Sequence, residues 1–185
     1  MPASEFDGVL SRARKGDAEA FAWLFRRSQP PLLRYLSVLG GVDVAEDVAS
    51  ETWVAVIRDL GGFAGDEDGF RAWLVTVARN RLVDLRRWEA RRPAVPTPEP
   101  PESSVLAADA ADEVVAREGA QWALDLIATL PPDQAEAVLL RVVVGLDATA
   151  TGQVMGRTSG AVRVLAHRGL RTLQDRLTAG ARSEV

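Results

Sequence analysis

The segment from Phe70 to Trp88 combines arginines, aromatic residues and apolar residues at helical spacing. Its apolar side chains recur every three or four residues, which predicts a helix with one buried stripe: Trp73, Leu74, Val77, Ala78, Leu82 and Leu85. Between them lie five arginines: Arg71, Arg79, Arg81, Arg86 and Arg87. Guanidinium groups bind phosphates and aromatic rings stack on bases, so the exposed side of this helix is a candidate nucleic-acid surface. An ordinary solvated helix face is the alternative interpretation.

Carboxylates gather on the helix predicted just before it, at residues 45–60. Asp43, Asp47 and Glu51 recur four residues apart, with Glu46 beside them. The opposite stripe of this helix is apolar: Ala45, Ala49, Trp53, Val56 and Leu60. Such an acidic face is either a solvated surface or a docking surface for a basic partner, where binding relieves the repulsion between the carboxylates. Paired catalytic carboxylates rank last, because no base or nucleophile accompanies them.

Residues 61–69, GGFAGDEDG, form a predicted loop between these two helices. Phe63 is its lone internal aromatic residue. A lone aromatic residue in a loop usually packs into the core, but in a nucleic-acid-binding protein it can border a pocket for an extruded base.

The C-terminal part contains a candidate helix-turn-helix. The predicted first helix covers Ala148–Met155, the turn Gly156–Thr158 and the second helix Ser159–Leu177. Gly156 suits a left-handed helix end, and Thr158 or Ser159 suits the next cap. We expect four apolar residues of the second helix to face inward: Val162, Leu165, Leu170 and Leu173. Arginines and the single histidine are left for the outer face, where a recognition helix contacts bases and phosphates. An ordinary helical hairpin is the alternative.

The remaining patterns predict an all-α chain of two domains. Further helices are predicted at Phe6–Lys15, Ala18–Ser28, Pro31–Leu39, Val114–Leu130 and Pro132–Val143, with a break at Gln29–Pro30. Residues 93–112 are rich in proline and acidic residues and are predicted to be a flexible linker. The predicted domains are therefore residues 1–92 and 113–185.

Composition excludes several function classes. The net charge of −4 means that any nucleic-acid affinity must come from local patches. The absence of cysteine removes disulfides and thiolate chemistry and agrees with a cytoplasmic location, and one histidine cannot build a histidine-rich metal site. No apolar run is long enough to span a bilayer. We expect no cofactor, no metal and no catalytic site.

In their order, these segments resemble the extracytoplasmic-function sigma factors, the small bacterial sigma factors with only domains 2 and 4. The resemblance rests on AEDVASETWVAVI, FRAWLVTVARNRLVDLRR, the proline-rich linker, LPPDQAEAVLLRVVVGL and GRTSGAVRVLAHRGLRTL. It covers nearly the whole chain. It implies an alternative sigma factor that binds core RNA polymerase, recognises the −35 and −10 promoter elements and helps to melt DNA, without catalytic chemistry of its own.

The resemblance also implies roles for particular residues. The acidic helix would bind the β′ coiled coil of the polymerase through Asp43, Glu46, Asp47, Ser50 and Glu51. The −10 element would be recognised and melted by Phe63, Phe70, Arg71, Trp73, Arg79, Asn80, Arg86 and Arg87. The −35 element would be read by Arg157, Thr158, Ser159, Arg163, His167, Arg168 and Arg171. The second domain would also contact the β flap. Many members are held by an anti-sigma factor, and the sequence leaves open whether this chain has one.

The chain departs from the family pattern at two places. Ser50 stands where the family usually has glutamine before the last glutamate of the acidic helix. Thr151 and Gly152 stand where the family usually has Ile-Ala in the first helix of the helix-turn-helix, and a glycine inside a helix costs about 1 kcal/mol relative to alanine.

Two other function classes compete with this interpretation. A stand-alone helix-turn-helix regulator would need no acidic docking face. An all-helical interaction protein without DNA contact would leave both arginine-rich faces unexplained.

Overall fold

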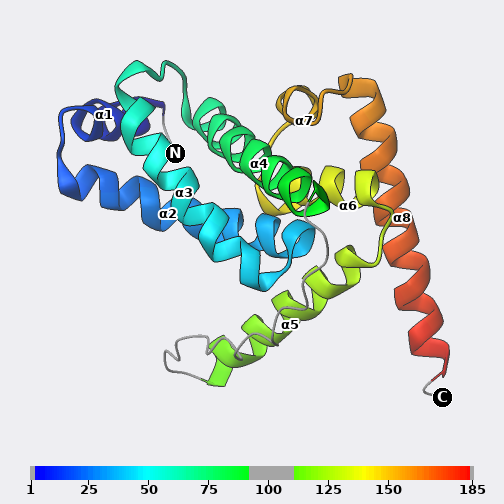
Figure 1. The fold of residues 1–185 in the computed structure, drawn as a ribbon. Helices are drawn as coiled ribbons and strands as arrows, with labels where there is room; N and C mark the ends of the chain where they lie inside the picture. Colours follow the sequence, from blue (N-terminus) through cyan, green and yellow to red (C-terminus); the bar gives the residue numbers. More distant parts are fainter. Residues whose placement is uncertain (1–2, 92–110, 184–185) are drawn as a thin grey trace.

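A computed structural model describes residues 3–91 and 111–183 of the chain. Within these ranges every regular element is helical and no strand is present, which confirms the predicted all-α class (Figure 1). No helix in the described ranges is long and apolar enough to cross a membrane.

The N-terminal unit is formed by four helices and one short turn. In chain order these are α1 (Ala3–Arg14), α2 (Ala18–Gly40), α3 (Val42–Asp59), the 3₁₀ turn η1 (Leu60–Gly62) and α4 (Glu67–Arg91). Asp17 begins α2, because its side chain accepts a hydrogen bond from the Ala20 amide at 3.0 Å. The predicted apolar stripe of α3 is fully buried, and Leu74, Ala78 and Leu82 bury the matching stripe of α4. These stripes fix which faces of α3 and α4 remain available for partners.

The predicted break at Gln29–Pro30 is wrong, because α2 continues through Pro30 and Pro31 as one helix. Proline inside a helix removes a backbone hydrogen bond and crowds the preceding turn. Packing outweighs this cost, since the buried face stays in phase on both sides of the prolines: Leu24, Ser28, Leu32, Tyr35 and Leu36. Gln29 is also anchored, because its Oε1 accepts a hydrogen bond from Trp53 Nε1 at 2.6 Å.

The C-terminal unit is formed by four helices and one π-helical turn. These are α5 (Ala111–Ala128), α6 (Pro132–Val138), the π-helical turn η2 (Leu139–Val143), α7 (Ala148–Met155) and α8 (Ser159–Ser183). The predicted bounds of α7 are confirmed, whereas the helix predicted over Pro132–Val143 changes to π geometry at Leu139. The predicted linker, residues 93–112, lies outside the described residues except for its last two, which begin α5.

The two units pack against each other. Helices α2 and α4 lie beside α5, α6, η2 and α7, and Figure 1 shows α4 next to α6 and α7. The contact therefore involves α4, the arginine-rich helix.

Candidate nucleic-acid and polymerase surfaces

The acidic face of α3 is open to solvent. The five residues predicted to bind a basic partner are all exposed: Asp43, Glu46, Asp47, Ser50 and Glu51. Glu51 reaches across to α4, where its Oε2 lies 2.8 Å from Arg81 Nη1. A groove of about 460 Å³ runs between the two helices and is lined by Asp47, Glu51, Arg81 and Trp88 among others. The face thus combines exposed carboxylates, of which Glu51 is paired with Arg81, with an adjoining groove.

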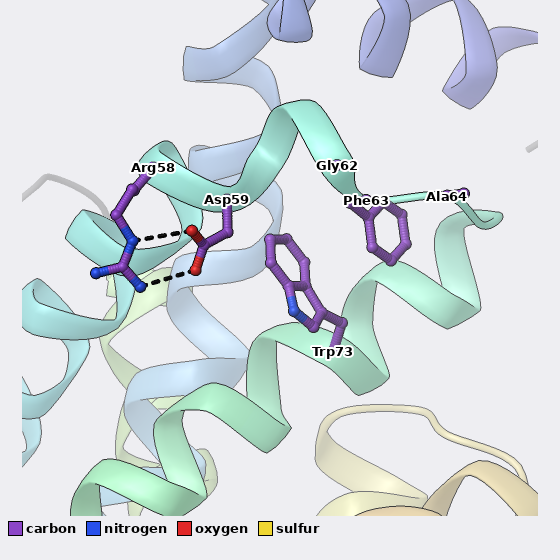
Figure 2. A pocket seen from close by; sticks show the side chains of 6 residues that line it. All are labelled: Arg58, Asp59, Gly62, Phe63, Ala64 and Trp73. Carbon is purple, nitrogen blue, oxygen red and sulfur yellow. Dashed lines mark hydrogen bonds and ion pairs between the residues drawn. The ribbon is translucent and has the colours of Figure 1, made fainter.

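Phe63 borders a shallow pocket at the start of the arginine-rich helix. Its ring stacks on Trp73, with ring centroids 5.0 Å apart and planes inclined by 19° (Figure 2). The pocket has a volume of about 610 Å³ and is lined by Arg58, Asp59, Gly62, Phe63, Ala64 and Trp73. Both aromatic side chains are half-buried. A flat, partly exposed aromatic surface beside a pocket is suited to stacking an unpaired base.

Phe70, also predicted to contact DNA, lies in the core with 1% of its surface exposed. Its ring packs against Phe6, Phe63 and Trp73 at centroid distances of 6.0, 5.7 and 5.9 Å. Any effect of Phe70 on DNA therefore acts through the two rings that it supports.

The arginines of α4 are mostly engaged within the protein. Arg71 pairs with Asp68, Arg81 with Glu51, and Arg86 donates to the Leu39 carbonyl. Arg87 lies 3.6 Å from Asp84, and both side chains are largely exposed. Asn80 is exposed as well. An exposed ion pair such as that of Arg87 with Asp84 contributes only about 0–1 kcal/mol.

Arg79 makes the one described ion pair that joins the two units. Its Nε donates to Glu136 Oε1 at 2.7 Å, and Tyr35 Oη donates to the same oxygen at 2.9 Å. Tyr35 is fully buried, and burial together with the adjacent Glu136 carboxylate holds the pKa of its hydroxyl well above the usual value. The hydrogen bond that Arg79 donates to Glu136 raises the pKa of the Arg79 guanidinium above its usual value. Tyr35 therefore remains a protonated donor at physiological pH.

The predicted helix-turn-helix is present as α7, a turn and α8. Gly156 ends α7 with φ 65° and ψ 38°, the left-handed conformation that its position predicted. Thr158 caps α8, because its Oγ1 accepts a hydrogen bond from the Ala161 amide at 3.2 Å. Ser159 is half-buried. The other residues predicted to read DNA in this unit are exposed: Arg157, Thr158, Arg163, His167, Arg168 and Arg171. Arg157 also pairs with Asp133 of α6 at 2.7 Å.

The prediction that Leu170 faces inward is wrong, since 47% of its surface is exposed. The inward face of α8 is set by Val162, Ala166 and Gly169, which recur at helical spacing. A Cβ at Gly169 would lie 2.8 Å from Val138 and 3.4 Å from a backbone oxygen of α6. This close approach of α8 to α6 turns Leu170 toward solvent, while Leu165 and Leu173 are half-buried as predicted.

The unusual Thr151-Gly152 pair has a structural consequence. A Cβ at Gly152 would lie 2.6 Å from the Arg157 carbonyl oxygen, so α7 approaches its own turn too closely for a side chain there. Thr151 is fully buried, and its hydroxyl has no hydrogen-bond partner among the described residues. The helix-turn-helix is therefore packed more tightly at this point than a helix with alanine would allow.

Sequence reasoning missed several residues of these surfaces. Arg58 and Asp59 form a two-bond ion pair at the rim of the aromatic pocket, at 2.9 and 2.8 Å (Figure 2). Tyr35 and Glu136 were not singled out, because nothing in the sequence joins residues 101 positions apart. Within the described residues, no cluster of three or more histidine or acidic side chains could hold a metal ion.

Comparison with known proteins agrees with this geometry. Residues 24–92 match the Sigma-70 region 2 family, and residues 120–173 match Sigma-70 region 4. The extracytoplasmic-function RNA polymerase sigma factor ShbA of Streptomyces griseus is 37% identical, over 90% of this chain and 92% of its own. The factor BldN of Streptomyces coelicolor is 34% identical, over 98% of this chain and 71% of its own.

A solved structure shares the fold. CnrH, in complex with the cytosolic domain of CnrY, superposes with a TM-score of 0.62 at 23% identity, covering 92% of this chain and 96% of that chain.

Proposed function

Since the chain belongs to the extracytoplasmic-function sigma factors of RNA polymerase, we propose that its surfaces divide promoter-specific initiation among them. As an alternative sigma factor it directs transcription, and members of this family bind core polymerase and promoter DNA. The comparisons give no support to a stand-alone helix-turn-helix regulator, because the region 2 match covers the N-terminal unit as well.

The acidic face of α3 is the proposed contact with the β′ coiled coil of the polymerase. Its five polar side chains are exposed together on one side of a helix whose other side is buried. Carboxylates on one helix face attract a basic helix, and binding of that helix relieves the repulsion among them. Ser50 stands in place of the usual glutamine, so a short hydroxyl side chain replaces a longer amide side chain at the centre of this face.

The Phe63–Trp73 pocket and α4 are the proposed −10 surface. The stacked rings offer a platform for one extruded base, and Asn80 offers an exposed amide for a base edge. Arg86 and Arg87 lie further along α4 and extend the basic surface for phosphates. Bases inside duplex DNA are stacked on their neighbours, so only an unpaired base can stack on these half-exposed rings. The aromatic stack is therefore the observation that supports the melting role.

The helix-turn-helix is the proposed −35 reader, with residues 113–185 as sigma domain 4 and residues 1–92 as sigma domain 2. The exposed residues at the start of α8 would meet base edges, and Arg168 and Arg171 would hold the backbone. The same domain would also contact the β flap. The chain itself carries out no catalysis in this scheme, since the polymerase supplies the active site, and it acts in the cytoplasm where that enzyme works. An anti-sigma factor is a further proposed partner of unassigned type.

Promoter melting tests the aromatic pocket. With 2-aminopurine placed in the −10 non-template strand, holoenzyme containing this factor should raise the fluorescence as the base unstacks. We expect Phe63→Ala to lower the equilibrium constant for melting, obtained from this amplitude, by about 5- to 150-fold, since base–aromatic stacking contributes about 1–3 kcal/mol.

A matched control is Phe25→Ala, which removes a partly exposed ring of α2 that lies outside the pocket. This variant should melt the promoter as the unaltered factor does. Normal melting by Phe63→Ala in a holoenzyme of full occupancy would show that the pocket has no part in base capture.

A further inference from the structure

We infer that the size of residue 65 sets how well this factor melts a promoter: Gly65 is a positioning residue, whose missing side chain leaves room for the Phe63 ring to stack on Trp73. This inference rests on the proposed function, because it takes the Phe63–Trp73 pocket to be the site that captures an extruded base. Gly65 lies in the loop between η1 and α4 and does not line the pocket itself. It therefore acts on DNA only through the position of Phe63.

A side chain at position 65 would collide with the Phe63 ring. A Cβ on Gly65 would lie 2.9 Å from Cζ of Phe63, and 3.5 and 3.6 Å from Cε1 and Cε2 of the same ring. Carbon atoms in contact lie about 3.5–4.0 Å apart, so the tip of the ring would have to move by about 0.6–1.1 Å. The backbone of Gly65, unlike that of Gly41 or Gly156, does not lie in the left-handed region. The structure therefore needs glycine at position 65 for space and not for backbone conformation.

The loop backbone is anchored on both sides of Gly65. After it, Asp66 Oδ1 accepts a hydrogen bond from the Gly69 amide at 2.8 Å, and the Asp66 carbonyl accepts one from the Phe70 amide at 2.9 Å. Before it, the Phe63 amide donates to a carbonyl of η1 at 3.2 Å. Turning one side chain by a small angle costs less than breaking these three hydrogen bonds. A clash at position 65 is therefore relieved by the ring of Phe63 and not by the backbone.

The ring cannot yield without changing its position on Trp73. It stacks on Trp73 at a centroid distance of 5.0 Å, and it meets Phe70 edge-on at 5.7 Å and 81° (Figure 2 shows the stacked pair). Two sides of the ring are thus occupied, and a side chain at position 65 would press on its tip. The stacked pair is the platform proposed for the extruded base, so the geometry of that platform depends on residue 65. Phe63 is only half-buried, and we expect the fold to tolerate the shift.

A graded series of side chains at position 65 measures this dependence. The readout is the equilibrium constant for melting, from 2-aminopurine in the −10 non-template strand. A gap of about 0.5–1 Å removes about a quarter to a half of the attraction between two groups. Applied to base–aromatic stacking, this loss predicts that Gly65→Ala lowers the equilibrium constant by about 1.5- to 12-fold. The bulkier Gly65→Val should lower it further, toward the value of Phe63→Ala.

A double-mutant cycle separates positioning from a general disturbance of the loop. In the Phe63→Ala background there is no ring for residue 65 to displace, so adding Gly65→Val should leave the equilibrium constant for melting unchanged. Affinity for core polymerase should be the same in all these chains, because the acidic face of α3 is not altered. Gly61→Ala is the matched control, since a Cβ at Gly61 would meet no atom within 4 Å. This control should melt the promoter as the unaltered factor does.

Two results would overturn the positioning role. One is equal melting by Gly65→Val and the unaltered factor, and the other is an equal loss from Gly65→Val with and without the Phe63 ring. A failure of the proposed function would look different. In that case Phe63→Ala alone would leave melting unchanged in a holoenzyme of full occupancy, and the role of Gly65 would fall with that of the pocket.

Discussion

Replacing Asp47 and Glu51 together by lysine is expected to weaken binding to core polymerase by about 30- to 1000-fold. Both carboxylates are exposed on α3 and lie next to the groove shared with α4. Each substitution turns an attraction toward a basic coiled coil into a repulsion, and like charges brought together at an interface cost several kcal/mol. We take about 2–4 kcal/mol for the pair, which gives the stated range. Fluorescence anisotropy of the labelled factor, titrated with core polymerase, measures the loss.

The fold should survive this change. Glu51 makes one described ion pair, with Arg81, and 66% of its side chain is exposed. Such a surface pair contributes about 0–1 kcal/mol. The control Asp7→Lys/Glu19→Lys changes the net charge equally on exposed positions of α1 and α2. If both variants bound polymerase as the unaltered factor does, α3 would not be the docking face.

The second large effect is expected in α8. Replacing Arg163, the proposed base contact, and Arg168, the proposed backbone contact, together by alanine should lower initiation at a −35-dependent promoter at least about fivefold, since an arginine that contacts a base contributes about 1–3 kcal/mol. Both side chains are exposed on the outer face of the helix, opposite Val162 and Ala166. The measurement is the rate of run-off initiation at limiting holoenzyme.

Two controls separate DNA reading from general damage. Arg26→Ala removes an exposed arginine of α2, far from α8 in the chain, and should leave the rate unchanged. Heteroduplex DNA that is already open at the −10 element should be less sensitive to the double alanine variant than duplex promoter. Equal initiation by the variant and the unaltered factor on the −35-dependent promoter would remove α8 from the assignment.

Local sequence patterns predicted most of the helices because the apolar residues recur in phase. The stripe from Ala45 to Leu60 is buried as expected, and Gly156 and Thr158 end and begin helices as their chemistry indicates. The error at Pro30 came from treating proline as decisive. Leu24 and Leu32 lie on one face eight residues apart, and this unbroken phase was the available sign of a continuous helix.

Contacts between helices determine which side chains are buried or paired, and local sequence patterns do not predict these contacts. Leu170 has the spacing of a buried residue, but the close approach at Gly169 determines which face of α8 turns inward. In the sequence Glu136 is an ordinary polar helix residue, and only the structure shows that Tyr35 and Arg79 donate hydrogen bonds to its carboxylate. The arginines of α4 were predicted to form a basic surface from their position between apolar residues at helical spacing. Their ion pairs with Asp68, Glu51 and Glu136 depend on elements whose positions the sequence alone did not provide.

Reconstituted transcription tests the central assignment most directly. Core polymerase free of other sigma factors is mixed with the purified chain and a promoter library, and run-off transcripts are sequenced. We expect the chain to elute with core polymerase, and transcripts to start downstream of a shared pair of −35 and −10 sequences only when the chain is present. Absence of a holoenzyme together with absence of such transcripts would contradict this assignment.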